Sequence, residues 1–344
     1  MKRFASLMLV LTMCLSLISC DAGNSSAESS QPSGVQETQQ QAETDAQPSD
    51  TESQESVFPF TLTTKDGAEI TFTGVPERVL VTNVNPGDEL MALGLGDKII
   101  GTGWNNTVVA EEFRSEYESK PVIFETSPSL ETILDLEPDF IYGRSSSFTE
   151  KLGTEHDTLS GYGIPSLSNI ESYTVGADLD DVYQDFYNLG KIFQVEDRAE
   201  AVVSAMKEKV ADIQKAVAGQ ETVKVFVYDK TRDDGAYTCG NNFTATLMEY
   251  AGGENIFKDM EKTWQVVSWE EIVERNPDII VIDDYGDIPL EQKISELKDN
   301  PALATVNAIK NDNIISVTLC EVFASSQTAN TIEKFAHAFH PDCF

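Results

Sequence analysis

One block of thirteen residues occurs twice in the sequence and decides the fold. The first copy, residues 129–141, reads SLETILDLEPDFI, and the second, residues 268–280, reads SWEEIVERNPDII. Six positions are identical at a constant offset of 139 residues. Upstream, a Leu-Met pair followed by a glycine is also repeated, beginning at Leu90 and at Leu247. A period this long is not that of a solenoid, so the repeat predicts two related lobes.

Short β-rich runs alternate with helical patterns around both copies. Alternating apolar residues on either side of Asp66-Gly67 predict a hairpin. The other predicted strands are Arg78–Thr82, Lys98–Gly101, Phe140–Tyr142 and Lys224–Tyr228, and the predicted helices of the first copy are Asp88–Leu95 and Leu130–Leu136. Such alternation predicts an α/β fold in which each lobe is a mostly parallel sheet flanked by helices.

A helical stretch separates the two copies. Apolar residues recur at helical spacing from Leu179 to Leu189 and again from Ala199 to Val217. The second helix, about 21 residues from Asp197, would be roughly 32 Å long, which is enough to join two lobes rigidly and limit their motion. The predicted boundaries are residues 58–176 for the N-terminal lobe, 177–218 for the helical segment and 219–344 for the C-terminal lobe.

The N-terminal residues resemble a bacterial lipoprotein signal. Lys2 and Arg3 precede an apolar stretch, residues 4–18, that is too short for a permanent transmembrane helix. The stretch ends in Leu17-Ile18-Ser19-Cys20, which is similar to a lipobox. We expect residues 1–19 to be a signal peptide and Cys20 to be acylated, which anchors the protein to the outside of the cell membrane, on the periplasmic side in a two-membrane cell. The alternative is an ordinary secretory signal with an incidental cysteine.

Residues 20–57 are predicted to be a disordered acidic tether. They contain no Lys or Arg and only two large aliphatic residues, Val35 and Val57. Such a segment cannot bury enough apolar surface to offset its chain entropy.

The overall charge and the cysteines restrict the possible partners and cross-links. A formal net charge of −34 argues against binding to nucleic acid or directly to anionic lipid surfaces. After Cys20 the chain has three cysteines, Cys239, Cys320 and Cys343, so at most one disulfide can form among them. Buried free thiols are the interpretation we favour.

The sequence lacks the signatures of common catalysts. It contains no zinc-protease His pair, no Walker loop and no Gly-x-Ser-x-Gly motif. Its only histidines, His156, His337 and His340, are too scattered for a histidine-rich metal site. We therefore expect no enzyme, no resident metal and no cofactor, although an α/β fold alone does not exclude a surface-anchored enzyme.

Each repeated block begins with a helix cap. Ser129 and Ser268 are predicted N-caps, and Ser268 with Glu271 has the pattern of a capping box. Glu131 and Glu270 then occupy the second helical position of each lobe, from which a carboxylate can point outward. A favourable interaction with the helix dipole, worth about 0.3–1 kcal/mol, would explain an acidic residue there without any partner.

The chain resembles the helical-backbone, class III periplasmic binding proteins that serve ABC importers of ferric siderophores, vitamin B12 and haem. Besides the repeated block, the resemblance rests on three motifs: PERVLV at 76–81, ELMALGLGD at 89–97 and AGGENIF at 251–257. It implies a monomeric receptor that takes a small-molecule ligand to the importer. In that family the glutamate of each repeated block docks on arginines of the two membrane subunits, which carries over to Glu131 and Glu270.

Ligands of such folds bind beyond the carboxyl ends of the strands, here between the lobes. The residues predicted to contact the ligand are Asn83, Asn85, Trp104, Tyr142, Arg144, Tyr228, Lys230, Arg232, Tyr237, Trp264 and Tyr285. Aromatic rings offer flat contact surfaces, and Arg144 or Arg232 could hold an anionic chelate through two hydrogen bonds. A ferric siderophore is the first expected ligand, cobalamin or another corrinoid the second, and haem the third.

Overall fold

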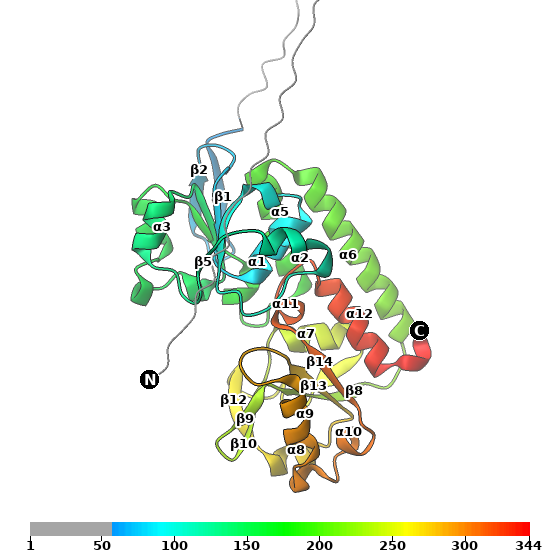
Figure 1. Cartoon of the computed structure of the whole chain (residues 1–344). Coiled ribbons are helices and arrows are strands. Elements are labelled where there is room, and N and C mark those ends of the chain that lie inside the picture. The colour runs from blue at the N-terminus through cyan, green and yellow to red at the C-terminus, as the bar shows by residue number, and fades with distance from the viewer. Residues whose placement is uncertain (1–56) are drawn as a thin grey trace, which may run out of the picture. The chain divides into compact units, whose positions relative to one another are not determined.

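Two parallel β-sheets carry the two copies of the repeated block in the computed structural model, which describes residues 57–344 (Figure 1). The predicted signal peptide, the predicted lipidation site Cys20 and the predicted tether up to residue 56 lie outside the described residues. Residues 57–344 belong to a single compact unit, so the two lobes share one packed body.

The N-terminal lobe contains a five-stranded parallel sheet in the order β5-β4-β3-β6-β7 and a separate hairpin, β1-β2. The strands are β1 (Phe60–Thr63), β2 (Glu69–Phe72), β3 (Val79–Val81), β4 (Ile99–Gly103), β5 (Val122–Phe124), β6 (Phe140–Gly143) and β7 (Ser166–Ser168). The helices are α1 (Val84–Ala92), α2 (Glu111–Glu118), α3 (Leu130–Leu136) and α4 (His156–Gly161), and a short 3-10 helix, η4 (Ile170–Tyr173), follows β7.

The C-terminal lobe contains a four-stranded parallel sheet, β11-β8-β13-β14, and a three-stranded antiparallel sheet, β12-β10-β9, which the sequence did not predict. Its strands are β8 (Val223–Tyr228), β9 (Lys230–Arg232), β10 (Gly235–Cys239), β11 (Gly253–Asn255), β12 (Trp264–Ser268), β13 (Ile279–Asp283) and β14 (Ile314–Val317). Its helices are α7 (Phe243–Tyr250), α8 (Trp269–Arg275), α9 (Leu290–Lys298), α10 (Asn307–Lys310), α11 (Leu319–Val322) and α12 (Thr328–Phe339).

The repeated blocks occupy equivalent places in the two sheets. In each block a short helix, α3 or α8, leads into the strand beside the first strand of its parallel sheet, β6 beside β3 and β13 beside β8. The aspartate of each Pro-Asp pair fixes this strand pairing: Asp139 accepts hydrogen bonds from the backbone N–H of Arg78 and Asp278 from that of Lys224, at 2.8 and 3.3 Å. The structure thus confirms that the sequence repeat is a structural repeat.

The predicted hairpin is confirmed, whereas the first helix begins earlier than predicted. Gly67 has a φ of +89° in the turn, a conformation that glycine adopts without strain. Helix α1 begins at Val84 rather than Asp88 because Pro86 lies in its first turn, where a missing N–H group costs no helical hydrogen bond.

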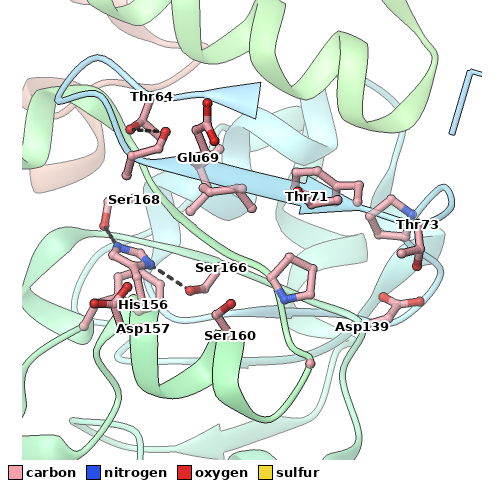
Figure 2. A pocket seen from close by; sticks show the side chains of 18 of the residues that line it. Thr64, Glu69, Thr71, Thr73, Asp139, His156, Asp157, Ser160, Ser166 and Ser168 are labelled. Atoms are coloured by element: carbon pink, nitrogen blue, oxygen red, sulfur yellow. Dashed lines mark hydrogen bonds between the residues drawn. The ribbon is translucent and has the colours of Figure 1, made fainter. Parts of the chain in front are cut away.

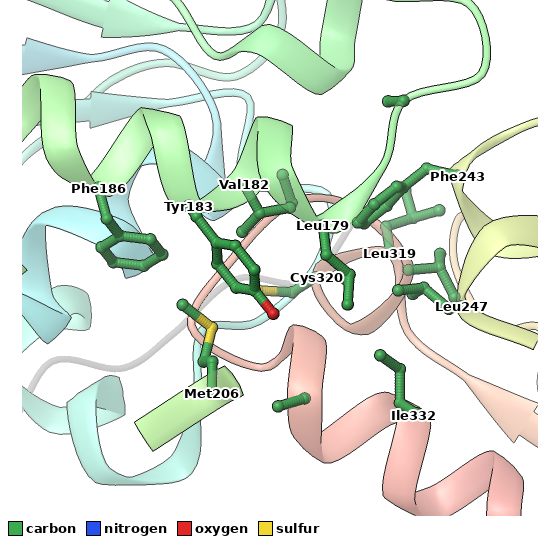
Figure 3. Packing of buried hydrophobic residues seen from close by; sticks show 14 of the residues in the cluster. Leu179, Val182, Tyr183, Phe186, Met206, Phe243, Leu247, Leu319, Cys320 and Ile332 are labelled. Atoms are coloured by element: carbon green, nitrogen blue, oxygen red, sulfur yellow. The ribbon is translucent and has the colours of Figure 1, made fainter. Parts of the chain in front are cut away.

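Two long helices, α5 (Leu179–Phe193) and α6 (Glu196–Val217), connect the lobes, and α6 confirms the predicted long helix. Helix α6 packs against α5 along one part and against α12 of the C-terminal lobe along another. Apolar side chains from α5, α6, α7, α11 and α12 meet in one cluster (Figure 3). The same continuous core includes Val79 of the first sheet and Val225 of the second, so the lobes are joined by buried apolar contacts as well as by the chain.

Polar contacts also cross between α1 and the segment that precedes α12. The Asn85 amide donates a hydrogen bond to the carbonyl oxygen of Ala324 at 2.9 Å, and the Ser326 N–H donates to the Asp88 carboxylate at 2.9 Å. Cys320 lies in this segment, and the structure confirms it and Cys239 as buried free thiols, whereas Cys343 is free but only partly buried. Among residues 57–344, none of the helices combines the length and apolar character needed to cross a bilayer.

Truncating the core between the lobes should destabilise the whole folded unit. Phe186 of α5 is fully buried in the cluster of Figure 3, so Phe186→Ala leaves a cavity and should lower the free energy of unfolding by about 3–5 kcal/mol. Urea denaturation measures this change. The partly exposed Val266→Ala is the control and should cost less than about 1 kcal/mol; equal effects of the two substitutions would contradict the assignment of this core.

Candidate functional site

A cavity of about 310 Å³ lies between the two lobes. The N-terminal lobe contributes the segment that follows β7, including η4, and the C-terminal lobe contributes the start of α7, the start of β12 and the end of α11. We call this cavity the cleft, and its lining residues are Arg144, Glu171–Gly176, Asn241–Thr244, Thr263, Trp264, Val322 and Phe323. Two of the predicted ligand-binding residues, Arg144 and Trp264, therefore line it.

Arg144 immediately follows β6 and makes a two-pronged ion pair with Glu171. Its Nη1 lies 2.5 Å from Oε2 and its Nη2 lies 3.3 Å from Oε1 of Glu171. The guanidinium also stacks on the ring of Phe323, 3.8 Å from its centroid. The positive charge in the cleft is thus already matched by a carboxylate and covered on one face by an aromatic ring.

The antiparallel sheet β12-β10-β9 presents an aromatic pair next to the cleft. Tyr237 of β10 and Trp264 of β12 are diagonal neighbours on paired strands, and their rings stack with centroids 5.5 Å apart. Lys230 and Arg232 of β9 lie 5.8 and 5.4 Å from the Tyr237 centroid, within the range of cation–π attraction. Four predicted residues are therefore gathered on one small sheet, although only Trp264 lines the cleft.

Tyr142 and Tyr228, also predicted to contact ligand, are fully buried in this conformation, so neither side chain reaches the cleft. Side chains alternate along a strand, and these two point into the helical layers that cover their sheets. The Tyr142 hydroxyl donates to the carboxylate of Glu89, and the Tyr228 hydroxyl donates to that of Glu296 at 2.8 Å. Both tyrosines are core residues.

Asn83 and Asn85 are structural rather than exposed to the cleft. The Asn83 side-chain oxygen accepts hydrogen bonds from the backbone N–H of Arg144 at 3.0 Å and from the Ser147 hydroxyl at 3.1 Å. Asn85 makes the interlobe contact with Ala324 described above. Asn83 therefore acts on the cleft only indirectly, by fixing the backbone that carries Arg144.

Trp104 and Tyr285 are half-buried and do not line the cleft. Trp104 adopts a positive φ of 50° after β4, and its backbone N–H donates to the carbonyl oxygen of Phe124. The Tyr285 hydroxyl donates to the carboxylate of Asp229 at 3.0 Å.

Sequence reasoning missed most of the cleft, including Glu171, Asn241 and Phe323. Glu171 and its neighbours follow β7, a three-residue strand that was not predicted. Pro165 and the small polar residues Ser166, Ser168 and Asn169 that follow it were the available signal for that strand end. Phe323 comes from a segment that reaches the cleft only because α11 and α12 fold back against the first lobe.

Three carboxyl groups are buried close behind the first-lobe wall of the cleft. Burial raises the pKa of Glu89 and of Asp185 well above the usual range, and their mutual repulsion raises that of Glu89 further. Burial also raises the pKa of Asp88, although hydrogen bonds from Ser326 and Ala110 oppose the shift. Glu89 and Asp185, with the larger shifts, favour their neutral, protonated forms and add little negative charge behind the cleft.

The C-terminal lobe has a similar group at the ends of β8 and β13. Asp229, Asp283 and Lys293 are all nearly inaccessible to solvent. The Lys293 ammonium donates to the backbone carbonyl oxygen of Asp283 at 2.5 Å. Burial, followed by the proximity of Asp229, raises the pKa of Asp283 to about 7.

A larger cavity, of about 640 Å³, lies within the N-terminal lobe between β2 of the hairpin and the α4-β7 region (Figure 2). The imidazole of His156 lies in it, bonded to the hydroxyls of Ser166 and Ser168 at 2.7 and 3.0 Å. Burial lowers the pKa of His156, so the ring favours its neutral form. We take the smaller interlobe cleft as the candidate site because both lobes and an aromatic pair converge there.

The two glutamates predicted to dock on an importer occupy equivalent positions. Each follows its capping serine by two residues, and the Ser268–Glu271 capping box forms as predicted. Both Glu131 and Glu270 are exposed. Among residues 57–344 neither carboxylate has an ion-pair partner.

Two lobes that share a repeated block, joined by a long helix and enclosing a cleft, define the fold of a solute-binding protein. A model of the periplasmic binding protein family matches residues 80–318, and the chain belongs to that family. This match and the relatives confirm the resemblance to the substrate-binding proteins of ABC importers.

Individual relatives cover most of the chain. The uncharacterized ABC transporter substrate-binding lipoprotein YvrC of Bacillus subtilis is 24% identical over 294 residues, covering 84% of this chain and 88% of the relative. The cobalamin-binding protein of Halobacterium salinarum is 25% identical over 291 residues, covering 82% and 74%. The crystal structure of a periplasmic binding protein from Veillonella parvula superposes with a TM-score of 0.75 at 26% identity, covering 82% of this chain and 97% of that one.

The buried Asp283 carboxyl predicts a pH-dependent stability. In the unfolded chain an aspartate ionises near pH 4, whereas in the folded protein the pKa of Asp283 is about 7. The folded state therefore holds this proton more tightly, and the stabilisation is complete below about pH 4 and is lost as the pH rises toward 7.

Asp283→Asn removes this ionisation. The stability of the variant relative to the native chain should increase from pH 4 to 7 by up to about 4 kcal/mol, since each pKa unit corresponds to about 1.4 kcal/mol. Urea unfolding at a series of pH values measures this difference, with the exposed Asp212→Asn as the control. A difference that does not change with pH would contradict the prediction.

Proposed function

We propose that this protein is a lipid-anchored extracytoplasmic receptor that binds a metal chelate of low net charge, with a corrinoid as the first candidate, and delivers it to an ABC importer. The cleft supports this proposal through its mixture of aromatic rings, amides and hydroxyls. A corrinoid is larger than the cleft, so it would extend from the cleft over Trp264 and the stacked ring of Tyr237.

The observation that carries the choice of ligand is the ion pair between Arg144 and Glu171. The sequence favoured a ferric siderophore because that is the commonest cargo of the resembled family and because basic groups such as Arg144 and Arg232 occur with aromatic ones at the predicted cleft. In the structure Arg144 is bonded to Glu171, and Arg232 is exposed beside Tyr237 outside the cleft. A corrinoid such as cyanocobalamin carries no net charge and many amide groups, which suits Asn241, Asn242 and the neighbouring hydroxyls. The cobalamin-binding relative supports the same choice.

A ferric hydroxamate siderophore is the second candidate. Such chelates are neutral or weakly charged, so the same amides and hydroxyls would serve them, and the absence of a free cation would not weaken binding. Haem is the third candidate: Tyr173 lines the cleft and could supply an axial ligand, but among the described residues no histidine lines it.

A thermal-shift panel tests the ligand class. Cyanocobalamin, a ferric hydroxamate, a ferric tris-catecholate and haem are each added to the purified protein. A receptor at a hundredfold excess of ligand over Kd gains about 2.7 kcal/mol of stability, so we expect a clear rise in Tm with cyanocobalamin and none with the anionic tris-catecholate. No shift with either neutral chelate would contradict the proposal.

An uptake assay tests the importer contact. The double variant Glu131→Ala/Glu270→Ala should abolish ligand uptake in cells while leaving ligand affinity unchanged, because both carboxylates are exposed on the outer faces of their helices and lie outside the cleft lining. The matched control is Asp135→Ala/Glu274→Ala, which removes exposed carboxylates one turn further along the same two helices. Normal uptake by the first double variant would show that these glutamates do not dock.

A further inference from the structure

The ion pair in the cleft differs from the other ion pairs of residues 57–344. Arg144 and Glu171 are only 16% and 10% exposed, and in each of the others at least one partner is more than a fifth exposed. Exposed pairs contribute little to stability or recognition. A shielded pair with two nearly parallel contacts is strong, and losing one partner leaves the other charge without compensation.

The backbone holds both partners in place. The N–H of Ser145, next to Arg144, donates to the Ser172 hydroxyl at 2.9 Å, and the Ser145 hydroxyl donates to the Ser172 carbonyl oxygen at 2.7 Å. Since Ser172 follows Glu171, these two bonds tie the arginine segment directly to the glutamate segment. The N–H of Arg144 is held by Asn83, as described above. The pair is therefore built into the wall of the cleft.

Glu171 is the group that neutralises Arg144. The neighbouring carboxyls of Glu89 and Asp185 favour their protonated forms because they are buried. Phe323 covers the guanidinium face but supplies no formal charge. Arg144 is the only basic side chain among the described residues that line the cleft, so the Glu171 carboxylate sets whether the cleft presents a positive charge or none.

We propose that Glu171 is a charge selector that makes the receptor discriminate against strongly anionic chelates by holding Arg144. An anionic ligand can bind Arg144 only by separating the pair or by accepting the repulsion of Glu171, and both lower its affinity. A neutral chelate meets neither penalty. Discrimination of this kind comes from a feature that opposes the wrong ligand. The inference rests on the proposed function and deepens it.

The test compares full-length purified proteins by quenching of tryptophan fluorescence, since Trp264 lines the cleft. The probes are cyanocobalamin, a neutral ferric hydroxamate and a ferric tris-catecholate. Glu171→Gln should raise the affinity for the tris-catecholate at least tenfold and change that for the neutral chelates less than threefold. If this variant does not fold, Glu171→Ser serves the same purpose.

Two controls identify the source of the gain. Glu77→Gln removes one negative charge from a surface pair with Lys98 and should leave all three affinities unchanged. Arg144→Gln combined with Glu171→Gln should lose the gain, because the freed guanidinium is what binds the anion. The selector is wrong if Glu171→Gln binds the tris-catecholate no more tightly than Glu77→Gln does. It is also wrong if the native chain binds the tris-catecholate as tightly as Glu171→Gln does.

The outcomes also separate this inference from the proposed function. If the native chain binds neither neutral chelate while Glu171→Gln gains affinity for the tris-catecholate, the selector is supported and the proposed function is wrong. If the native chain binds a neutral chelate and Glu171→Gln gains no affinity for the tris-catecholate, only the selector is wrong. If no variant binds any probe, both are wrong.

Discussion

The cleft depends on one packed apolar interface, the cluster of α5, α6, α7, α11 and α12 side chains between the lobes (Figure 3). Burial of apolar area is the main favourable contribution to folding, and here the buried surface belongs to both lobes at once. Because interiors are close-packed, the lobes cannot slide past each other without opening voids. The bonds from α1 to Ala324 and Ser326 then fix the segment that carries Phe323 into the cleft. A receptor built this way should open only modestly.

The parts of the fold that sequence reasoning predicted are those in which local chemistry is repeated. The Pro-Asp pair recurs because its aspartate must hold the start of a neighbouring strand in both lobes, and the capping serine recurs because each short helix needs an N-cap. Such requirements are met by residues close together in the sequence. The parallel sheets, the long helix and the positions of Glu131 and Glu270 could therefore be predicted from local sequence patterns. The antiparallel sheet was missed because β9 has three residues and β12 follows a long irregular segment.

The candidate site was harder to predict because its members are brought together by tertiary packing. The end of a strand predicts that a residue is near the cleft but not which way its side chain points, and alternation sends Tyr142 and Tyr228 into the core. Glu171, the partner of Arg144, follows the short edge strand β7, whose sequence has no strong β pattern. The ring that covers the Arg144 guanidinium belongs to Phe323, nearly 180 residues further along the chain. The sequence identified Arg144 but not the carboxylate that neutralises it, and the ligand that we propose changes with that one contact.

The net charge of the protein and the charge of its binding site are set independently. A formal charge of −34 lies on a chain whose cleft is nearly neutral, because its one arginine is paired and the carboxyls behind it favour their protonated forms. Exposed charges separated from the cleft by more than about 8–10 Å are largely screened at physiological ionic strength, whereas a shielded pair in contact with the ligand is not. In the proposed receptor, recognition therefore falls to stacking on Trp264 and Tyr237 and to hydrogen bonds from amides and hydroxyls, none of which requires a charged ligand.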